Sequence, residues 1–323
     1  MKFGACVLVA VIGLAGPAAA GQKRPQAGKT GKTPAAKPAV DMTAVQTQVM
    51  LDRAGFSPGE IDGALGTSTK RALEAFTKSG GRADALPADA VIAYTITEQD
   101  AAGPFTPDIP EDMVEKSKLP ALGFATLLEA LGERFHASPA LLKRMNPAAT
   151  FVAGEEIQVP NVAVAVQPVG PPRGRQSDAV ATPGNPAATT VTVRKSTSDI
   201  TVADGTGKIL MYAPVTTGSE HDPLPIGEWK VTGVQKDPKF HYNPDLFWDA
   251  EPGHAKATIP AGPNNPVGVG WVDITKPHYG LHGTPEPAAV GKTASHGCVR
   301  LTNWDAAKLG SLVRPGTKVV FTE

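Results

Sequence analysis

The character of the chain changes at residues 163–189, a segment rich in proline, glycine and alanine, and this change does most to limit the fold. After it, apolar and polar residues alternate in short runs, as at residues 190–193 and 200–202, with the two-residue period of a half-buried strand. Residues 204–207, Asp-Gly-Thr-Gly, are typical of a hairpin turn. The 34 glycines and 31 prolines among 323 residues favour turns and strands over a helical bundle. We therefore predict one mainly β domain over residues 190–323, a sandwich or partly open barrel.

The first twenty residues have the three parts of a secretory signal peptide. Lys2 supplies a positive start, residues 3–14 are apolar, and the alanines at 18–20 form a small-residue cleavage site. The apolar run is short for a bilayer crossing, so a retained membrane anchor is the weaker alternative. No later run reaches 18 consecutive apolar residues. We expect secretion across the inner membrane to the periplasm or cell wall, without stable membrane insertion.

Charge and cysteine content argue against several classes of protein. Lys plus Arg number 31 and Asp plus Glu number 31, which gives no electrostatic basis for binding nucleic acid. Cys6 lies within the predicted signal peptide, so the exported chain keeps only Cys298. A lone thiol in an oxidising compartment is either buried and inert or has a chemical task. The absence of a C-x-x-C pair argues against a thiol oxidoreductase.

A helical unit is predicted over residues 41–102, with its core at 41–80, after a basic linker that spans residues 21–40. Glycines suit the loop between its helices to positive φ, and Thr67 is expected to cap the second helix, with Leu73 and Phe76 facing inward. The phrase D-G-x-x-G-x-x-T followed by A-L-x-x-F resembles the three-helix peptidoglycan-binding domain. A generic helical spacer is the alternative.

A second small unit is predicted over residues 119–162. Apolar residues have helical spacing over 128–135, and Ser138 with Pro139 starts another helix that ends at Asn146. With its closing phrase G-x-x-I-x-V-P, this unit resembles a LysM module, an α+β fold of strand, helix, helix and strand. Ala-Thr-Leu-Leu replaces the Gly-Asp-Thr-Leu that begins the family's motif, so the resemblance supports the fold better than binding of glycan strands.

Residues able to perform nucleophilic catalysis gather in two phrases, Tyr-Gly-Leu-His-Gly-Thr at 279–284 and Ser-His-Gly-Cys-Val-Arg at 295–300. A reactive Cys298 needs a base or a positive neighbour, since the thiolate is the nucleophile. His282 and His296 both qualify, and the residues alone do not choose between them. The flanking glycines leave backbone N–H groups free to hold an oxyanion.

Other polar and aromatic residues near these phrases have structural interpretations. Asn303 and Asp305 are candidates to cap the helix that follows. Three aromatic residues, Tyr279, Trp271 and Trp304, are expected in the core or the pocket wall. Three other histidines, His221, His241 and His254, are expected in loops. No Cys/His cluster has the spacing of zinc ligands, so we predict neither a metal nor a cofactor.

The two phrases together resemble the catalytic domain of the YkuD-type L,D-transpeptidases, whose motif contains a first histidine and then [ST]-H-G-C-x-[RN]. The resemblance extends over roughly residues 190–322. It implies that Cys298 attacks the carbonyl between the third and fourth residues of a peptidoglycan stem peptide. It also implies that His282 is the base, oriented by the backbone carbonyl of Gly283.

The same resemblance gives roles to four further residues. The backbone N–H groups of Gly297 and Cys298 are expected to hold the oxyanion. Arg300 is expected to bind substrate carboxylates, for which its planar fork is suited, with a plain ion pair as the alternative. Ser295 and His296 are expected to shape the loop by hydrogen bonds.

The resemblance implies a two-step acyl transfer in wall biosynthesis. A tetrapeptide stem acylates Cys298 and releases D-alanine, and an amine of another stem then forms a 3–3 cross-link. Water as acceptor would make the enzyme an L,D-carboxypeptidase, and an amine of an outer-membrane protein or lipoprotein would attach that protein to the wall. A non-catalytic wall-binding protein is the alternative from another class, and the intact His, Cys and Arg set argues against it.

Overall fold

The structure, a computed structural model, describes residues 40–162, 190–251 and 253–323. The predicted signal peptide, the basic linker up to residue 39 and the segment 163–189 lie outside these ranges. The helices in the described part are α1 (Met42–Arg53), α2 (Thr67–Lys78), α3 (Glu98–Ala102), α4 (Met113–Lys116), α5 (Leu127–Arg134), α6 (Pro139–Met145) and α7 (Asn303–Leu312), with 3-10 turns η1 (Pro244–Leu246) and η2 (Pro287–Ala289). The strands are β1 (Val91–Thr95), β2 (Glu156–Pro160), β3 (Thr190–Arg194), β4 (Asp199–Ala203), β5 (Ile209–Pro214), β6 (Gly227–Lys236), β7 (Phe240–Tyr242), β8 (Ala257–Ile259), β9 (Gly270–Ile274), β10 (Gly280–His282), β11 (Val299–Arg300) and β12 (Lys318–Thr322).

The first helical pair, α1 and α2, packs through the apolar side chains that the sequence pattern indicated. Leu73 and Phe76 are half-buried against a cluster that includes Met50 and Leu51. The prediction that Thr67 caps α2 is wrong, because Thr67 is the first helical residue and Gly66 precedes it without a side-chain cap.

The loop between α1 and α2 lies against the β domain. Gly55, Gly59 and Gly63 have φ values of +84°, +81° and +71°, in the left-handed region expected of them. The Ser57 hydroxyl donates to Asp305 at 2.8 Å, and the Ser57 N–H donates to the carbonyl of Tyr212 at 2.8 Å. The loop that resembles part of the peptidoglycan-binding family is thus partly covered by residues of the β domain.

A second small core is built from a two-stranded sheet and two helices. β1 pairs antiparallel with β2, from Val91 opposite Pro160 to Thr95 opposite Glu156. The Ser138 hydroxyl caps α6, Pro139 is its first residue and Asn146 follows its last, as predicted. The pairing of β1 with β2 joins a strand of the unit predicted over residues 41–102 to a strand of the unit predicted over 119–162. The boundaries of these two units stay predictions.

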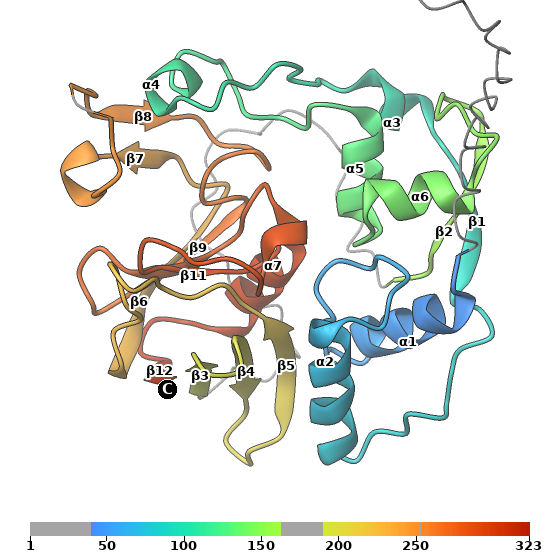
Figure 1. Cartoon of the computed structure of the whole chain (residues 1–323), viewed down its shortest axis with the longest axis horizontal. Helices are drawn as coiled ribbons and strands as arrows, with labels where there is room; N and C mark the ends of the chain where they lie inside the picture. The colour runs from blue at the N-terminus through green and yellow to red at the C-terminus, as the bar shows by residue number, and fades with distance from the viewer. Residues whose placement is uncertain (1–39, 163–189, 252) are drawn as a thin grey trace, which may run out of the picture. The chain divides into compact units, whose positions relative to one another are not determined.

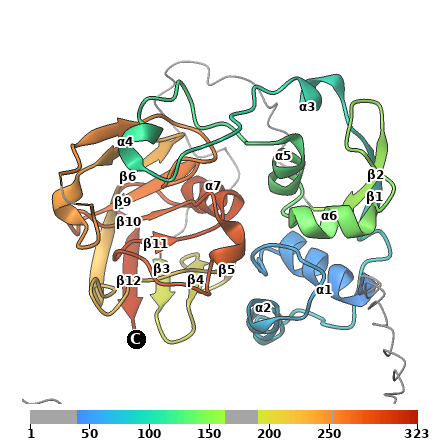
Figure 2. The ribbon, with the colours of Figure 1, turned by 45° about the horizontal axis from the view of Figure 1, so that its top comes forward.

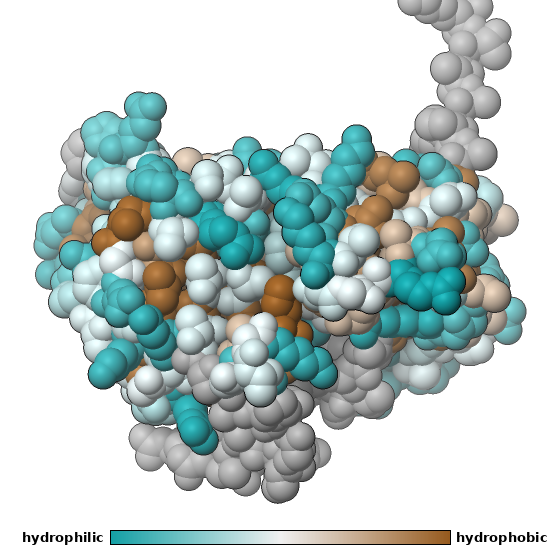
Figure 3. All heavy atoms as spheres, turned by 90° about the horizontal axis from the view of Figure 1, so that it is seen from below, coloured by the Kyte–Doolittle hydropathy of each residue, from teal (hydrophilic) through white to brown (hydrophobic). Residues whose placement is uncertain are grey.

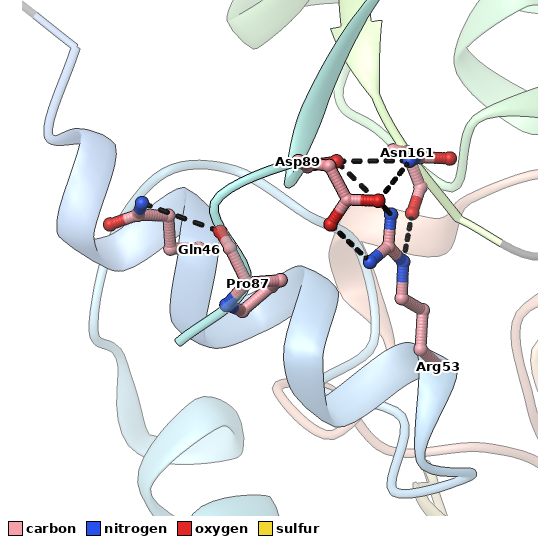
Figure 4. A network of polar contacts seen from close by, with 5 residues as sticks. All are labelled: Gln46, Arg53, Pro87, Asp89 and Asn161. Carbon is pink, nitrogen blue, oxygen red and sulfur yellow. Dashed lines mark hydrogen bonds and ion pairs between the residues drawn. The ribbon is translucent and has the colours of Figure 1, made fainter. Parts of the chain in front are cut away.

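Polar contacts join α1 to the sheet of β1 and β2 (Figure 4). The Arg53 guanidinium donates from Nε to the carbonyl of Asn161 at 2.6 Å and from Nη1 to Asp89 at 2.9 Å. Gln46 donates to the carbonyl of Pro87 at 3.4 Å. The two predicted N-terminal units therefore share one network of contacts.

Eight strands of residues 190–323 form one sheet in the order β11-β10-β9-β6-β12-β3-β4-β5 (Figure 1). Past the end of β5, Thr216 pairs with Arg300 of β11 through N–H to carbonyl bonds of 3.0 and 2.9 Å. The two edges of the sheet therefore meet, and the sheet is curled, closer to the predicted partly open barrel than to a sandwich. The mainly β character predicted for this part is confirmed.

Helix α7 packs against β9, β6 and β10, and Figure 2 shows it beside these strands. Ala306, Leu309 and Leu312 are buried in the core of the curled sheet. The expectation that Asn303 or Asp305 caps this helix is wrong, because the Thr302 hydroxyl accepts from the backbone N–H of Asp305 at 3.2 Å.

A separate hairpin is formed by β7 and β8, from Phe240 opposite Ile259 to Tyr242 opposite Ala257. His241 therefore lies in a strand, contrary to the prediction of a loop, because its neighbours Phe240 and Tyr242 pack in an apolar cluster. The residues between the two strands include the exposed Trp248.

The face of the molecule in Figure 3 carries hydrophobic residues in small groups between hydrophilic ones. Within residues 40–162, 190–251 and 253–323, no helix has both the length and the apolar character that a membrane crossing requires.

Candidate active site

The two strands β10 and β11 bring the predicted phrases together. They pair in parallel, with Leu281 opposite Val299 and His282 opposite Arg300. Cys298 comes directly before β11, and Arg300 lies near enough for its charge to act on both the Cys298 thiol and the His282 imidazole. His282 and Cys298, 16 positions apart in the sequence, thus both lie near one guanidinium.

The His282 side chain is held as a neutral imidazole. It is buried, its Nδ1 lies 2.6 Å from the carbonyl oxygen of Gly283, and its ring stacks on Trp271 at 5.4 Å. Burial lowers the pKa of His282 to about 4; the bond to Gly283 opposes this and the nearby Arg300 cation adds to it. A carbonyl can only accept, so in the neutral ring Nδ1 carries the proton and Nε2 is left with its lone pair.

The Cys298 thiol is half-buried, and two backbone groups hold it. The thiol donates to the carbonyl of His278 at 3.7 Å, and His278 itself has a left-handed φ of +67°. Burial raises the pKa of Cys298, while a hydrogen bond from the Gly280 backbone and the charge of Arg300 lower it. The resting pair is therefore a thiol and a neutral imidazole.

This charge state predicts a flat pH profile for reactions of the thiol with an acylating agent. A histidine of ordinary pKa would lose about tenfold in rate for each pH unit below 6.5 as it becomes protonated. The pKa of His282 is depressed to about 4, so its basic form persists down to that pH. We expect the second-order rate constant for acylation to change less than about twofold between pH 5.5 and 7.5. Stopped-flow or quenched mass spectrometry measures it, and an inflection near pH 6.5 would contradict the neutral pair.

The loop before Cys298 is fixed at Ser295 and turned at Gly297. The Ser295 hydroxyl donates to the carbonyl of Cys298 at 2.6 Å, and its backbone N–H donates to Thr217 at 3.0 Å. Gly297 has a φ of +99°, and a Cβ there would lie 2.6 Å from the Tyr279 ring, so only glycine fits. His296, between them, points away from this loop, with its Nε2 2.8 Å from Asp249.

Arg300 is half-buried beside the thiol and the imidazole. Its backbone is paired on both sides, to Thr216 and to His282 of β10. Among the residues that the structure describes, no carboxylate lies within ion-pair distance of its guanidinium. This disfavours the plain ion pair and leaves a cation available to an anionic ligand.

The structure adds three residues that the sequence did not single out for this site, and it places Trp271, expected in the core or the pocket wall, on His282. The His278 carbonyl and the Gly280 N–H contact the sulfur, and Asp249 contacts His296. Backbone contacts leave no mark on residue type, and Asp249 is 47 positions from its partner, so no local pattern revealed them. In the described part of the chain, no group of three or more His, Cys, Asp or Glu side chains is arranged to hold a metal ion.

A thiol and a neutral imidazole brought by two paired strands are groups suited to nucleophilic catalysis. The model of the YkuD family, the L,D-transpeptidase catalytic domain, matches residues 188–321. The chain belongs to this family.

Several relatives bear the name L,D-transpeptidase, and three of them follow. YkuD of Bacillus licheniformis is 45% identical over 60 residues, 19% of this chain and 36% of that protein. YkuD of Bacillus subtilis is 29% identical over 114 residues, 35% of this chain and 54% of that protein. YqjB of Bacillus subtilis is 31% identical over 147 residues, 44% of this chain and 73% of that protein. The chain thus spans about half or less of the length of the first two relatives.

Proposed function

We propose that this chain is a peptidoglycan L,D-transpeptidase in which Cys298 is the nucleophile. The observation that carries the proposal is the half-buried thiol of Cys298 directly before β11, which pairs with the strand of the neutral His282, with the charge of Arg300 acting on both groups. Membership of the YkuD family supports the substrate class, the stem peptides of the cell wall. No cofactor is needed, since the peptide bond that breaks supplies the acyl group.

In the first step, Nε2 of His282 takes the thiol proton as the sulfur attacks the carbonyl between the third and fourth stem residues. The carbonyl carbon becomes tetrahedral and its oxygen carries the negative charge. Backbone N–H groups of Gly297 and Cys298 are suited to stabilise that oxygen, since the left-handed Gly297 turns the backbone at this point. The C–N bond then breaks, His282 returns the proton to the leaving amine, and D-alanine departs from a thioester.

In the second step an amine attacks the thioester and His282 accepts the proton that the amine loses. Collapse of the tetrahedral intermediate forms the new amide and expels the sulfur, which takes back a proton. A diamino acid on another stem gives a 3–3 cross-link, an amine of an envelope protein gives an anchored protein, and water gives an L,D-carboxypeptidase. Arg300, free of a carboxylate partner in the described residues, is suited to bind a stem carboxylate during either step.

The setting that we propose is the periplasm or cell wall, after export by the segment 1–20. The N-terminal units 41–102 and 119–162 would keep the enzyme at the wall by contacting glycan strands. The hydrogen bond from Ser57 to Asp305 joins the first of these units to the β domain. Binding of this unit to the wall would therefore hold the β domain close to its substrate.

Incubation of the exported chain with purified muropeptides tests the proposed function. Tetrapeptide stems should lose D-alanine and yield dimers whose mass and fragmentation place the new bond between two third residues. Products that lack D-alanine but are never joined would establish the carboxypeptidase instead. Unchanged muropeptides, with folding verified by circular dichroism, would refute both activities.

A further inference from the structure

The hairpin of β7 and β8 reaches the loop that carries the nucleophilic cysteine. Asp249 lies 2.8 Å from Nε2 of His296, and the rings of Phe247 and Trp248 lie 5.2 and 6.0 Å from the same imidazole. Trp248 also stacks on His221 at 4.5 Å. His296 is therefore enclosed by one acidic and two aromatic side chains from a single hairpin.

The hairpin is held in turn by residues 103–124, the crossing segment between α3 and α5. Figure 1 shows this segment running from α3 to α4, which lies beside β8, and back to α5. Leu122 is fully buried in a cluster with Tyr242 and Ile259 of the hairpin.

Polar contacts fix the crossing segment in the same place. Asp112 lies 3.0 Å from Nε2 of His254, and Nδ1 of His254 lies 3.2 Å from the Tyr242 hydroxyl. The Leu122 N–H donates to Ala261 at 3.1 Å. Phe247 packs against the cluster around Leu122 and also contacts His296, so the contacts run without a break from the crossing segment to the cysteine loop.

The position of His296 matters because it lies between Ser295, where the loop is fixed, and Gly297, where the loop turns. The backbone of Ser295 is bonded to Thr217 and that of Arg300 to Thr216, whereas Gly297 has no side chain that could anchor it. The N–H groups that would face the oxyanion belong to Gly297 and Cys298, directly after His296. A misplacement of about 1 Å in such a site costs up to about 10²-fold in rate.

We propose that Asp249 is a positioning residue that fixes the oxyanion-binding loop through His296. This proposal rests on the proposed function, because it assigns a task within the same acyl transfer. Asp249 does not touch the reacting atoms; its carboxylate holds the imidazole of His296, the residue directly before Gly297. The crossing segment, which belongs to neither phrase of the family motif, contributes to the active site by keeping the hairpin in place.

The test compares Asp249→Ala, Asp249→Asn and a matched control, Asp245→Ala. Asp245 lies on the same hairpin and pairs only with the exposed Lys256 at 3.4 Å among the contacts described for its side chain, so its removal alters the hairpin's charge without touching His296. Two rates are measured by intact-mass spectrometry: acylation by a carbapenem, which develops an oxyanion, and alkylation by iodoacetamide, which needs the thiolate but develops none.

We expect Asp249→Ala to slow acylation by about tenfold, a fraction of the 10²–10³-fold cost of losing an oxyanion donor outright. Alkylation should stay within about twofold of the wild type, because the thiol and His282 are untouched. Asp249→Asn keeps an acceptor for the imidazole and should recover most of the acylation rate. The double variant Asp249→Ala/His296→Ala should be acylated no more slowly than His296→Ala alone, since either change removes the same contact between Asp249 and His296.

Several outcomes would overturn the assignment, and each points to a different error. If Asp249→Ala were acylated at the wild-type rate, Asp249 would have no positioning role. If the acylation and alkylation rates fell equally, the effect of Asp249 would be on the thiol. If Asp245→Ala lost as much acylation rate as Asp249→Ala, the effect would come from the charge of the hairpin. A wild-type enzyme that is alkylated but never acylated would refute the proposed function itself, and the positioning role with it.

Discussion

Replacement of Cys298 by alanine is expected to abolish acylation, both by tetrapeptide stems and by carbapenems. The change removes the only sulfur among the described residues that could form a thioester, and it removes a half-buried side chain smaller than most core residues. Folding should survive, since the lost thiol makes one weak bond, to the His278 carbonyl at 3.7 Å. Intact-mass spectrometry should find the inhibitor mass on the wild type and none on Cys298→Ala.

Cys298→Ser is the sharper companion variant, since it keeps the shape of the side chain and replaces the thiol by a hydroxyl. The pKa of an alcohol lies far above that of a thiol, and the neutral His282, with a pKa of about 4, is too weak a base to compensate. We expect Cys298→Ser to be nearly inert. Release of D-alanine by Cys298→Ala would show that another residue is the nucleophile, and equal melting temperatures of the three proteins serve as the control.

The secondary structure of the β domain followed from the sequence because each strand carries its own pattern. Residues 190–193 alternate with a period of two and became β3, and the Asp-Gly-Thr-Gly phrase at 204–207 became the turn before β5. The closure of the sheet did not follow. The pairing of Thr216 with Arg300 joins residues far apart in the chain, and an edge contact leaves no periodic trace.

The N-terminal part illustrates the same limit. The cap at Ser138 was predictable, since a hydroxyl before a proline and an apolar run has a local physical cause. The pairing of β1 with β2 was not, because the strand at 91–95 lies outside the segment that resembled a LysM module. Thr67 was misplaced by one position, since glycine at 66 can begin a helix without a side-chain acceptor.

The active site divides in the same way between side chains and backbone. Cys298, His282 and Arg300 were candidates because a thiol, an imidazole and a guanidinium are suited to this chemistry, and the resemblance to the YkuD family chose His282 over His296. Their closeness was an expectation that the parallel pairing of β10 and β11 explains. The carbonyl of His278 and the N–H of Gly280 could not be foreseen, because every residue carries these groups and only the fold selects which ones meet the sulfur.

The two histidines of the site should differ sharply in what their removal costs. His282→Ala deletes the proposed base, and we expect acylation to fall by roughly 10²–10⁴-fold. His296→Ala removes a ring held by Asp249 at 2.8 Å and should lose about tenfold, as a positioning group would. His282→Gln, which keeps more of the buried volume, separates loss of the base from loss of packing against Trp271.

Acylation rates measured by intact-mass spectrometry, with melting temperatures as the folding control, decide which histidine is the base. If His296→Ala were the inactive variant and His282→Ala the active one, the base would be His296, and the buried, neutral imidazole on Trp271 would be a structural residue.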